Sequence, residues 1–285
     1  MSAKMKIYDA HHHLWNLHDG NHDWLNGEDT TFCEYRAADY LTDMAQFEFV
    51  GSTVVEAAAT DVKAEAIWLN RELDELPGQH SIVAGCRLES DIAEEDLHIL
   101  LNIQKVKGIR QMLDWHPDYS GLRRPPLLDC KIWRRNLQLV IESGLLFEIQ
   151  IMPDQVNSVC ELVARHPDGC FVLNHAGARL PLVGDARNLW LTGMRELSLY
   201  ANVYVKLSGF AEVDPNWGQP VISQLIQHLL ECFGPERLMF GSNFPIEKTN
   251  VTFSETVQKT LCALEELSDH ERQAIMSNTA LAVYS

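Results

Sequence analysis

Short apolar runs rich in β-branched residues recur along the chain, separated by segments whose apolar positions are spaced by three and four residues. The first kind of run is typical of buried strands, and the second is typical of amphipathic helices. The pattern predicts eight strands, over residues 6–11, 51–58, 81–87, 107–113, 145–151, 171–175, 202–208 and 237–242. It also predicts intervening helices, most clearly over residues 61–76, 131–143 and 218–233.

Eight strands with a helix after most of them indicate a closed (β/α)₈ TIM barrel, an α/β fold formed by residues 1–285 as a single domain. An open doubly wound sheet is the alternative, but no glycine-rich nucleotide-binding motif follows the first strand. The connection over residues 14–50 is long for a compact domain, and it holds Trp15, Trp24, Phe32 and Tyr35. We expect this loop to cap the C-terminal face of the barrel; a packing role alone is the alternative.

Composition narrows the class of partner. The net charge of −17 disfavours nucleic acids and anionic membrane surfaces. The seven cysteines form no CxxC pair, and no apolar run approaches the roughly 18 residues of a membrane span. We therefore expect a cytoplasmic protein with free thiols that acts on a small molecule, without a nucleic-acid or membrane partner; a homo-oligomer is compatible with the sequence.

Histidines close two of the predicted strands, where the chemistry of such a barrel is found. The first strand ends in His11, His12 and His13, and the sixth ends in His175. Side chains alternate along a strand, so His11 and His13 should point one way and His12 the other. By the same parity Asp9 should lie one layer deeper and could orient an imidazole. The alternatives are a chance surface cluster at residues 11–13 and a core histidine at 175.

Cationic residues gather at the same predicted end of the barrel. They are Arg110, Arg123, Arg124, Arg179 and Lys206, with Trp115 and Gln150 nearby. Guanidinium groups suit carboxylates and polyhydroxylated acids, so Arg110, Arg123, Arg124, Lys206, Trp115 and Gln150 are predicted to bind substrate. Ordinary salt bridges at the rim are the alternative for each cation.

Five segments together resemble the amidohydrolase superfamily, and within it the amidohydrolase-related lactonases. They are Asp-Ala-His-His-His-Leu-Trp, Gly-Ile-Arg-Gln, Leu-Asn-His-Ala-Gly, Val-Lys-Leu-Ser-Gly and Met-Phe-Gly-Ser-Asn-Phe-Pro, in order between residue 7 and about residue 283. The resemblance implies a barrel of the metal-dependent-hydrolase type in which water attacks an activated carbonyl. It assigns His11, His13 and His175 to catalysis, and as ligands where a divalent ion is bound.

Two departures from that family pattern matter. Asn243 stands at the tip of the eighth strand where the family usually has an aspartate base, and the fifth strand carries Glu148 and Gln150 without a histidine. A binuclear centre is therefore not expected; the site should hold no metal or one divalent ion, preferably zinc. Asn243 and His116 complete the predicted catalytic set, and His116, Asp114 and Glu56 are the candidate bases.

The predicted activity is hydrolysis of the carboxylic ester bond in a small acidic or sugar-derived lactone. A decarboxylase or other lyase of the same superfamily is one alternative. A catalytically impaired barrel that binds a sugar acid is another, because Asn243 cannot take up a proton at neutral pH.

Overall fold

The computed structural model describes residues 5–25, 33–115, 126–179 and 181–285. Eight parallel strands form one sheet in the order of the chain, and each predicted strand is present with shifted ends. The strands are β1 (Lys6–His12), β2 (Glu48–Val55), β3 (Gln79–Gly85), β4 (Val106–Met112), β5 (Leu146–Gln150), β6 (Phe171–Leu173), β7 (Val203–Leu207) and β8 (Leu238–Phe240).

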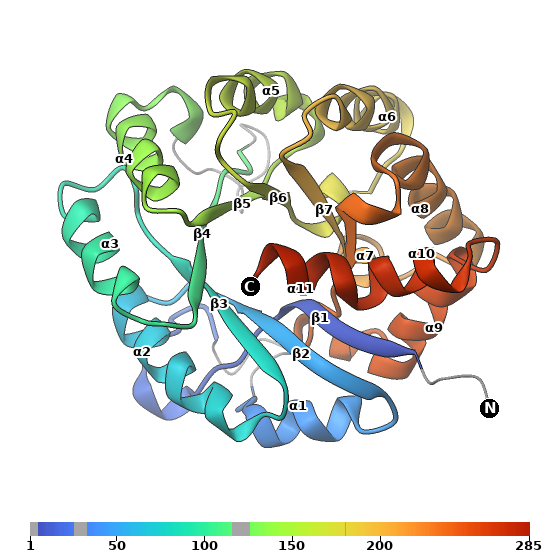
Figure 1. Ribbon diagram of the computed structural model, residues 1–285, viewed down its shortest axis with the longest axis horizontal. Helices are drawn as coiled ribbons and strands as arrows, with labels where there is room; N and C mark the ends of the chain where they lie inside the picture. The colour runs from blue at the N-terminus through green and yellow to red at the C-terminus, as the bar shows by residue number, and fades with distance from the viewer. Residues whose placement is uncertain (1–4, 26–32, 116–125, 180) are drawn as a thin grey trace.

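Helices surround the barrel, as Figure 1 shows in a view along its axis. They are α1 (Ala37–Met44), α2 (Val62–Glu72), α3 (Ala93–Leu101), α4 (Lys131–Glu142), α5 (Val156–Arg165), α6 (Gly184–Ser198), α7 (Phe210–Val213), α8 (Gln219–Phe233), α9 (Phe253–Ala263), α10 (Asp269–Gln273) and α11 (Thr279–Val283). Their ends follow local chemistry; the Asp61 side chain, for example, accepts hydrogen bonds from Lys63 N and Ala64 N and caps α2. Among the described residues, no helix is both long and apolar enough to cross a membrane.

The segment that follows β8 closes the barrel against β1. Asn243 N donates to the carbonyl of His11 at 2.7 Å, and His13 N donates to the carbonyl of Phe244 at 2.7 Å. These bonds continue the sheet beyond the end of β8 and bring the tips of the first and eighth strands together. The closed (β/α)₈ barrel predicted from the sequence is confirmed, and the open sheet is excluded.

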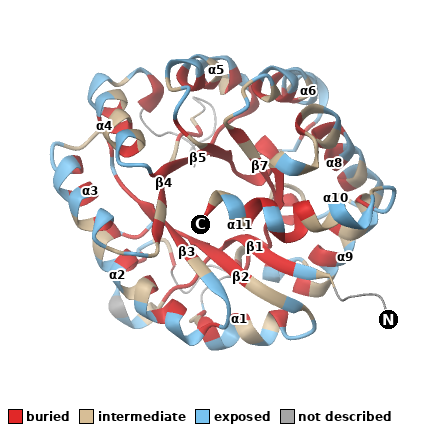
Figure 2. Cartoon of the chain, in the orientation of Figure 1, coloured by how far each residue is buried: buried red, intermediate tan, exposed pale blue. Residues whose placement is uncertain are grey.

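The apolar core has two layers. Tyr8, Val55, Val83 and Met239 belong to a small cluster inside the barrel, and a larger cluster joins the outer face of the strands to the helices. Figure 2 shows the strands buried over most of their length and the helices buried mainly on their inward faces.

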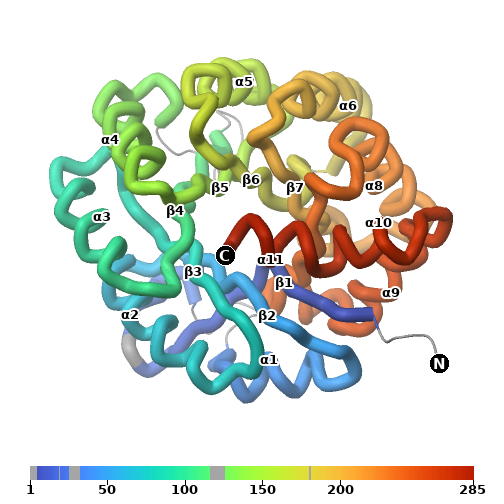
Figure 3. The backbone as a smooth tube through the Cα atoms, in the orientation of Figure 1, coloured from blue at the N-terminus to red at the C-terminus, as the bar shows by residue number. Residues whose placement is uncertain are grey.

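The C-terminal segment covers the N-terminal end of the barrel, where Figures 1 and 3 show α11 crossing the opening. The Tyr284 ring lies nearly parallel to that of Tyr8, and its hydroxyl donates to Glu148 inside the barrel. The opposite, C-terminal end is left for the site.

Candidate active site

A β-bulge in β1 sets the direction of the histidines. Asp9 pairs with Ser52 and His12 pairs with Val54, so three steps along β1 oppose two along β2. Beyond the bulge, His11 and His13 face the barrel interior, as predicted. His12 lies on the helix side, where its Nε2 is 2.9 Å from Ser52 Oγ and its ring stacks on Tyr40 at 3.9 Å.

The bulge reverses the predicted direction of Asp9, and the prediction that it orients an imidazole is wrong. Its carboxylate accepts from the Tyr40 hydroxyl, from the hydroxyl and the backbone N–H of Ser242, and from His11 N. Asp9 therefore holds the backbone of β1 against the segment after β8. Burial raises the pKa of this carboxyl to about 6, while the hydrogen bonds lower it.

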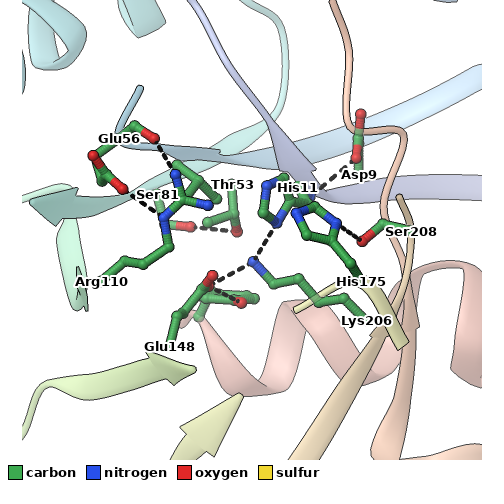
Figure 4. A network of polar contacts seen from close by, with 12 residues as sticks. Asp9, His11, Thr53, Glu56, Ser81, Arg110, Glu148, His175, Lys206 and Ser208 are labelled. Carbon is green, nitrogen blue, oxygen red and sulfur yellow. Dashed lines mark hydrogen bonds and ion pairs between the residues drawn. The ribbon is translucent and has the colours of Figure 1, made fainter. Parts of the chain in front are cut away.

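The three inward-facing histidines form one cluster. The Nε2 atoms of His11 and His13 are 3.3 Å apart, and the ring centres of His11 and His175 are 4.6 Å apart. Each outer histidine is fixed by its Nδ1, which lies 2.8 Å from the Val55 carbonyl in His13 and 3.0 Å from Ser208 Oγ in His175. Figure 4 shows His11 and His175 side by side, with Ser208 in contact with His175.

An ion pair within the barrel orients His11. Lys206 Nζ donates to Glu148 Oε1 at 2.6 Å and lies 3.4 Å from His11 Nδ1 (Figure 4). Burial lowers the pKa of Lys206 to about 8, so it is protonated at neutral pH and has only hydrogens to offer. His11 Nδ1 therefore accepts, and the ring proton sits on Nε2, which faces His13.

The same reasoning assigns the tautomer of His13. A carbonyl can only accept, so His13 Nδ1 carries the proton and its Nε2 keeps a lone pair toward His11. The pKa values of all three histidines are lowered, mainly by burial, and that of His13 falls to about 3. The cluster is neutral at neutral pH, with one directed hydrogen bond from His11 to His13.

A cavity of about 490 Å³ opens above these histidines at the C-terminal end of the barrel. That volume lies within the roughly 300–1,000 Å³ of small-molecule sites. Its walls include five residues predicted for the site and others contributed by the loops; the lining residues are His13, Trp15, Asp23, Trp24, Ala57, Ala58, Thr60, Arg110, Met112, Gln150, His175, Arg179, Glu212, Asn243 and Ile246.

Other predicted residues are placed differently. His11 and Lys206 are fully buried below the cavity, and Lys206 is satisfied by Glu148, so it is not positioned to reach a substrate. Trp115 is half-buried, its backbone N–H donates to Gln155, and it is not among the lining residues. His116, Arg123 and Arg124, with Phe32 of the long loop, lie outside the described residues.

Two of the candidate bases, Glu56 and Asp114, are among the described residues, and each carboxylate is bound by an arginine. Arg110 donates to the carboxylate and the carbonyl of Glu56, both at 2.6 Å, and Arg179 Nε donates to Asp114 at 3.1 Å. Ala58 N donates to the second carboxylate oxygen of Glu56. Both carboxylates are buried, and neither belongs to the cavity wall.

Glu212 of α7 is a third carboxylate at the site, and it was not predicted from the sequence. It lines the cavity, accepts from Arg179 Nη1 at 2.7 Å and from Asn243 Nδ2 at 2.8 Å, and its side chain is 26% exposed. The signal for it was positional, because Glu212 follows the seventh strand by five residues. The strand-end rule used for His13 and His175 would have reached it.

A three-ligand metal site is not formed by the part of the chain that the structure describes. No group of three or more His, Cys, Asp or Glu side chains there could hold an ion. The His11–His13 pair comes nearest, since about 3.3 Å also separates two nitrogen ligands on one tetrahedral zinc.

Comparisons of the sequence find one matching family and relatives of similar length. The amidohydrolase family profile matches residues 8–285. An L-fucono-1,5-lactonase of Burkholderia multivorans is 23% identical, over 97% of this chain and 95% of its own length.

Solved structures share the fold over nearly the whole chain. A Burkholderia multivorans amidohydrolase with bound zinc has a TM-score of 0.82 at 24% identity, covering 98% of both chains. A putative 2-pyrone-4,6-dicarboxylic acid hydrolase of Pseudomonas putida has a TM-score of 0.75 at 22% identity, covering 99% of this chain and 98% of its own. A 2,6-dihydroxybenzoate decarboxylase from Rhizobium has a TM-score of 0.64 at 13% identity, covering 100% and 99%.

Proposed function

Since the chain belongs to the amidohydrolase family, we propose that it is a hydrolase that opens a small acidic or sugar-derived lactone. Water attacks the lactone carbonyl, the ring C–O bond breaks, and a hydroxy acid is released. The names of its relatives, an L-fucono-1,5-lactonase and a putative 2-pyrone-4,6-dicarboxylic acid hydrolase, support this substrate class.

One observation carries the proposal: neutral imidazoles, two guanidinium groups and a carboxylate meet in a single cavity of about 490 Å³. Arg110 and Arg179 use part of their hydrogen-bonding capacity on Glu56, Asp114 and Glu212, and each guanidinium has five N–H groups in all. The remaining N–H groups suit a substrate carboxylate or the oxyanion formed during attack. Such a pocket recognises a small anionic ester despite the acidic surface.

The residues of the cluster take separate roles in this proposal. His175, held at Nδ1 by Ser208, turns Nε2 away from that contact and polarises the lactone carbonyl. His13 lies at the bottom of the cavity, and His11, which contacts Lys206, fixes the orientation of the His13 ring. Gln150 and Arg110 contact polar substituents of the substrate, while His116, Arg123, Arg124 and Trp115 stay predictions from the sequence.

A single divalent ion is a conditional part of the proposal, supported by the zinc-bound relative. His11 and His13 would hold it through Nε2, which requires the His11 ring proton to move from Nε2 to Nδ1; His175 is the predicted third ligand, and the ion would supply a Lewis acid beside the carbonyl. In their described positions the three histidines do not form a complete ligand set. The steps above therefore use the chain's own groups.

The long loop after β1 acts as a cap on the single barrel domain in this proposal. Trp15 and Trp24 line the cavity and pack edge to face at 5.5 Å, and the Trp24 indole donates to the carbonyl of Ala57. Trp15 also pairs through its backbone with Tyr35. These contacts support a wall of aromatic rings that excludes water from one side of the substrate.

The test is hydrolysis of a panel of aldono-1,5-lactones, aldono-1,4-lactones and pyrone or muconolactone dicarboxylates, followed with a pH indicator. Each assay is run on protein treated with a chelator and on protein supplied with zinc or manganese. Turnover of at least one lactone class above the spontaneous rate is expected. No turnover in any arm contradicts the proposal, and release of carbon dioxide from an aromatic acid would favour the lyase alternative.

A further inference from the structure

The cavity contains a carboxylate that the proposed lactone hydrolysis can use. Resting on that proposed function, we infer that Glu212 is the catalytic base that takes a proton from the attacking water, the role left open by Asn243. Among the described residues that line the cavity, Glu212 and Asp23 carry the carboxylates.

Three different elements hold Glu212 in place. Arg179, after β6, donates to its Oε1, and Asn243, after β8, donates to its Oε2. Glu247 of the 3₁₀ turn η8 (Ile246–Thr249) accepts from the backbone N–H groups of Ala211 and Glu212 at 3.0 and 3.3 Å. Although Glu212 lies on a helix of four residues, hydrogen bonds hold both its backbone and the two oxygens of its side chain.

Asn243 acts as a positioning residue. Its backbone lies in the left-handed region at φ 56°, and its side chain is buried with Nδ2 committed to Glu212. An asparagine amide can donate this bond, whereas an aspartate in its place would set two carboxylates against each other. In this chain the Asn243 amide and the Glu212 carboxylate are therefore parts of one arrangement, in which α7 supplies the carboxylate and the segment after β8 supplies its donor.

The other carboxylates near the site are less suited to the role. Glu56 and Asp114 are buried against Arg110 and Arg179, and neither lines the cavity in which the substrate would bind. Asp23 lies on the exposed cap, where it accepts from the Thr60 hydroxyl at 3.1 Å. Glu212 is oriented by a cation and an amide, and each of its oxygens keeps a lone pair because each accepts one of these side-chain bonds.

The proton balance follows from that position. Glu212 accepts a proton as the water oxygen bonds to the carbonyl carbon, and the carbonyl electrons move onto its oxygen. When that oxyanion collapses, the ring C–O bond breaks and the departing ring oxygen takes the proton back from Glu212. The carboxylate is regenerated, and the product is an open-chain hydroxy acid whose own acid proton passes to solvent.

The experiment compares Glu212→Gln with wild type on a lactone that wild type hydrolyses. The amide keeps the shape and an oxygen for Asn243, but it cannot take the proton. We expect kcat to fall about 10²–10⁴-fold, KM to change much less, and the thermal midpoint to be retained. Formate should restore part of the activity of Glu212→Ala, because a small carboxylate can enter the vacated space.

Two further variants separate this role from simple perturbation. Asp214→Asn removes one negative charge two residues away, outside the cavity wall, and should leave kcat unchanged. Asn243→Asp should lower kcat, because the donor to Glu212 is lost.

Each contrary outcome overturns the inference. It fails if Glu212→Gln retains kcat, if Asp23→Asn abolishes kcat instead, if Asp214→Asn matches the loss in Glu212→Gln, or if formate restores nothing. Asn243→Asp with higher activity than wild type would likewise contradict it. If the wild-type protein hydrolyses no lactone, the proposed function fails and this inference fails with it. If the wild type hydrolyses a lactone and a variant gives one of the contrary results above, only the role of Glu212 fails.

Discussion

Gly209 links the stability of the barrel to the geometry of His175. It follows β7 with φ 76° and ψ 8°, in the left-handed region that side chains other than glycine rarely adopt. A Cβ built on it would lie 2.6 Å from the Cβ, Cγ and Nδ1 atoms of His175. His175 is itself strained, with φ 52°, and is followed by Ala176 at φ 55° and Gly177 at φ 67°.

Two costs of Gly209→Ala can be worked from these values. The left-handed backbone costs an alanine about 1–2 kcal/mol, and forcing a methyl into a filled space adds about 1–3 kcal/mol. Relieving the contact from 2.6 Å to an ordinary 3.4 Å requires a displacement of 0.8 Å between the methyl group and His175. A displacement of that size at a reacting centre costs about 10²-fold in rate.

Gly144→Ala is the matched control. Gly144 follows α4 with φ 77°, and no atom lies within 4 Å of a Cβ added there. This variant should bear only the backbone cost and keep its activity. Thermal unfolding and lactonase kcat/KM, measured side by side, test the reasoning. Equal kcat/KM in the two variants, or equal loss of stability, would refute the claim that the Gly209 methyl acts through His175.

Three other variants test buried charges of the site. Burial raises the pKa of Glu247 from 4.5 to about 8, so between these pH values the folded protein keeps a proton that the unfolded chain has lost. The contribution of Glu247 to the free energy of unfolding therefore falls by about 1.4 kcal/mol for each pH unit gained in that window. Glu247→Gln should remove this contribution, and the same dependence of the thermal midpoint on pH in wild type and variant between pH 5 and 8 would contradict it. Lys206→Met leaves the buried Glu148 carboxylate without a cationic partner and should lower the free energy of unfolding by about 3–5 kcal/mol, with partial recovery on adding Glu148→Gln. Thermal unfolding of the single and double variants tests both effects, and an unchanged midpoint in Lys206→Met would contradict them. Arg110→Lys loses the forked contact with Glu56 and should raise KM for an anionic lactone about tenfold in steady-state kinetics; a KM within twofold of wild type would exclude Arg110 from substrate binding.

The sequence by itself determined the barrel and the elements that make it. All eight strands and the helices α2, α4 and α8 were predictable, because short apolar β-branched runs and apolar spacings of three to four residues are local properties of strands and helices. The strand-end rule also led to His13, His175, Arg110, Gln150 and Asn243 in one cavity, since the carboxyl ends of parallel strands meet at one end of a barrel.

Only the tertiary structure decided which way the other side chains face and which groups they meet. The bulge that turns Asp9 away from the site depends on how β1 pairs with β2, about 40 residues away, and simple alternation could not foresee it. From the sequence, Lys206 is a basic residue on a strand that could bind substrate. Its ion pair with Glu148, which belongs to another strand, keeps it buried below the cavity. The position of Glu212 after β7 is visible in the sequence, but its contacts with Arg179 and Asn243 are not, because pairings between distant segments leave no local pattern.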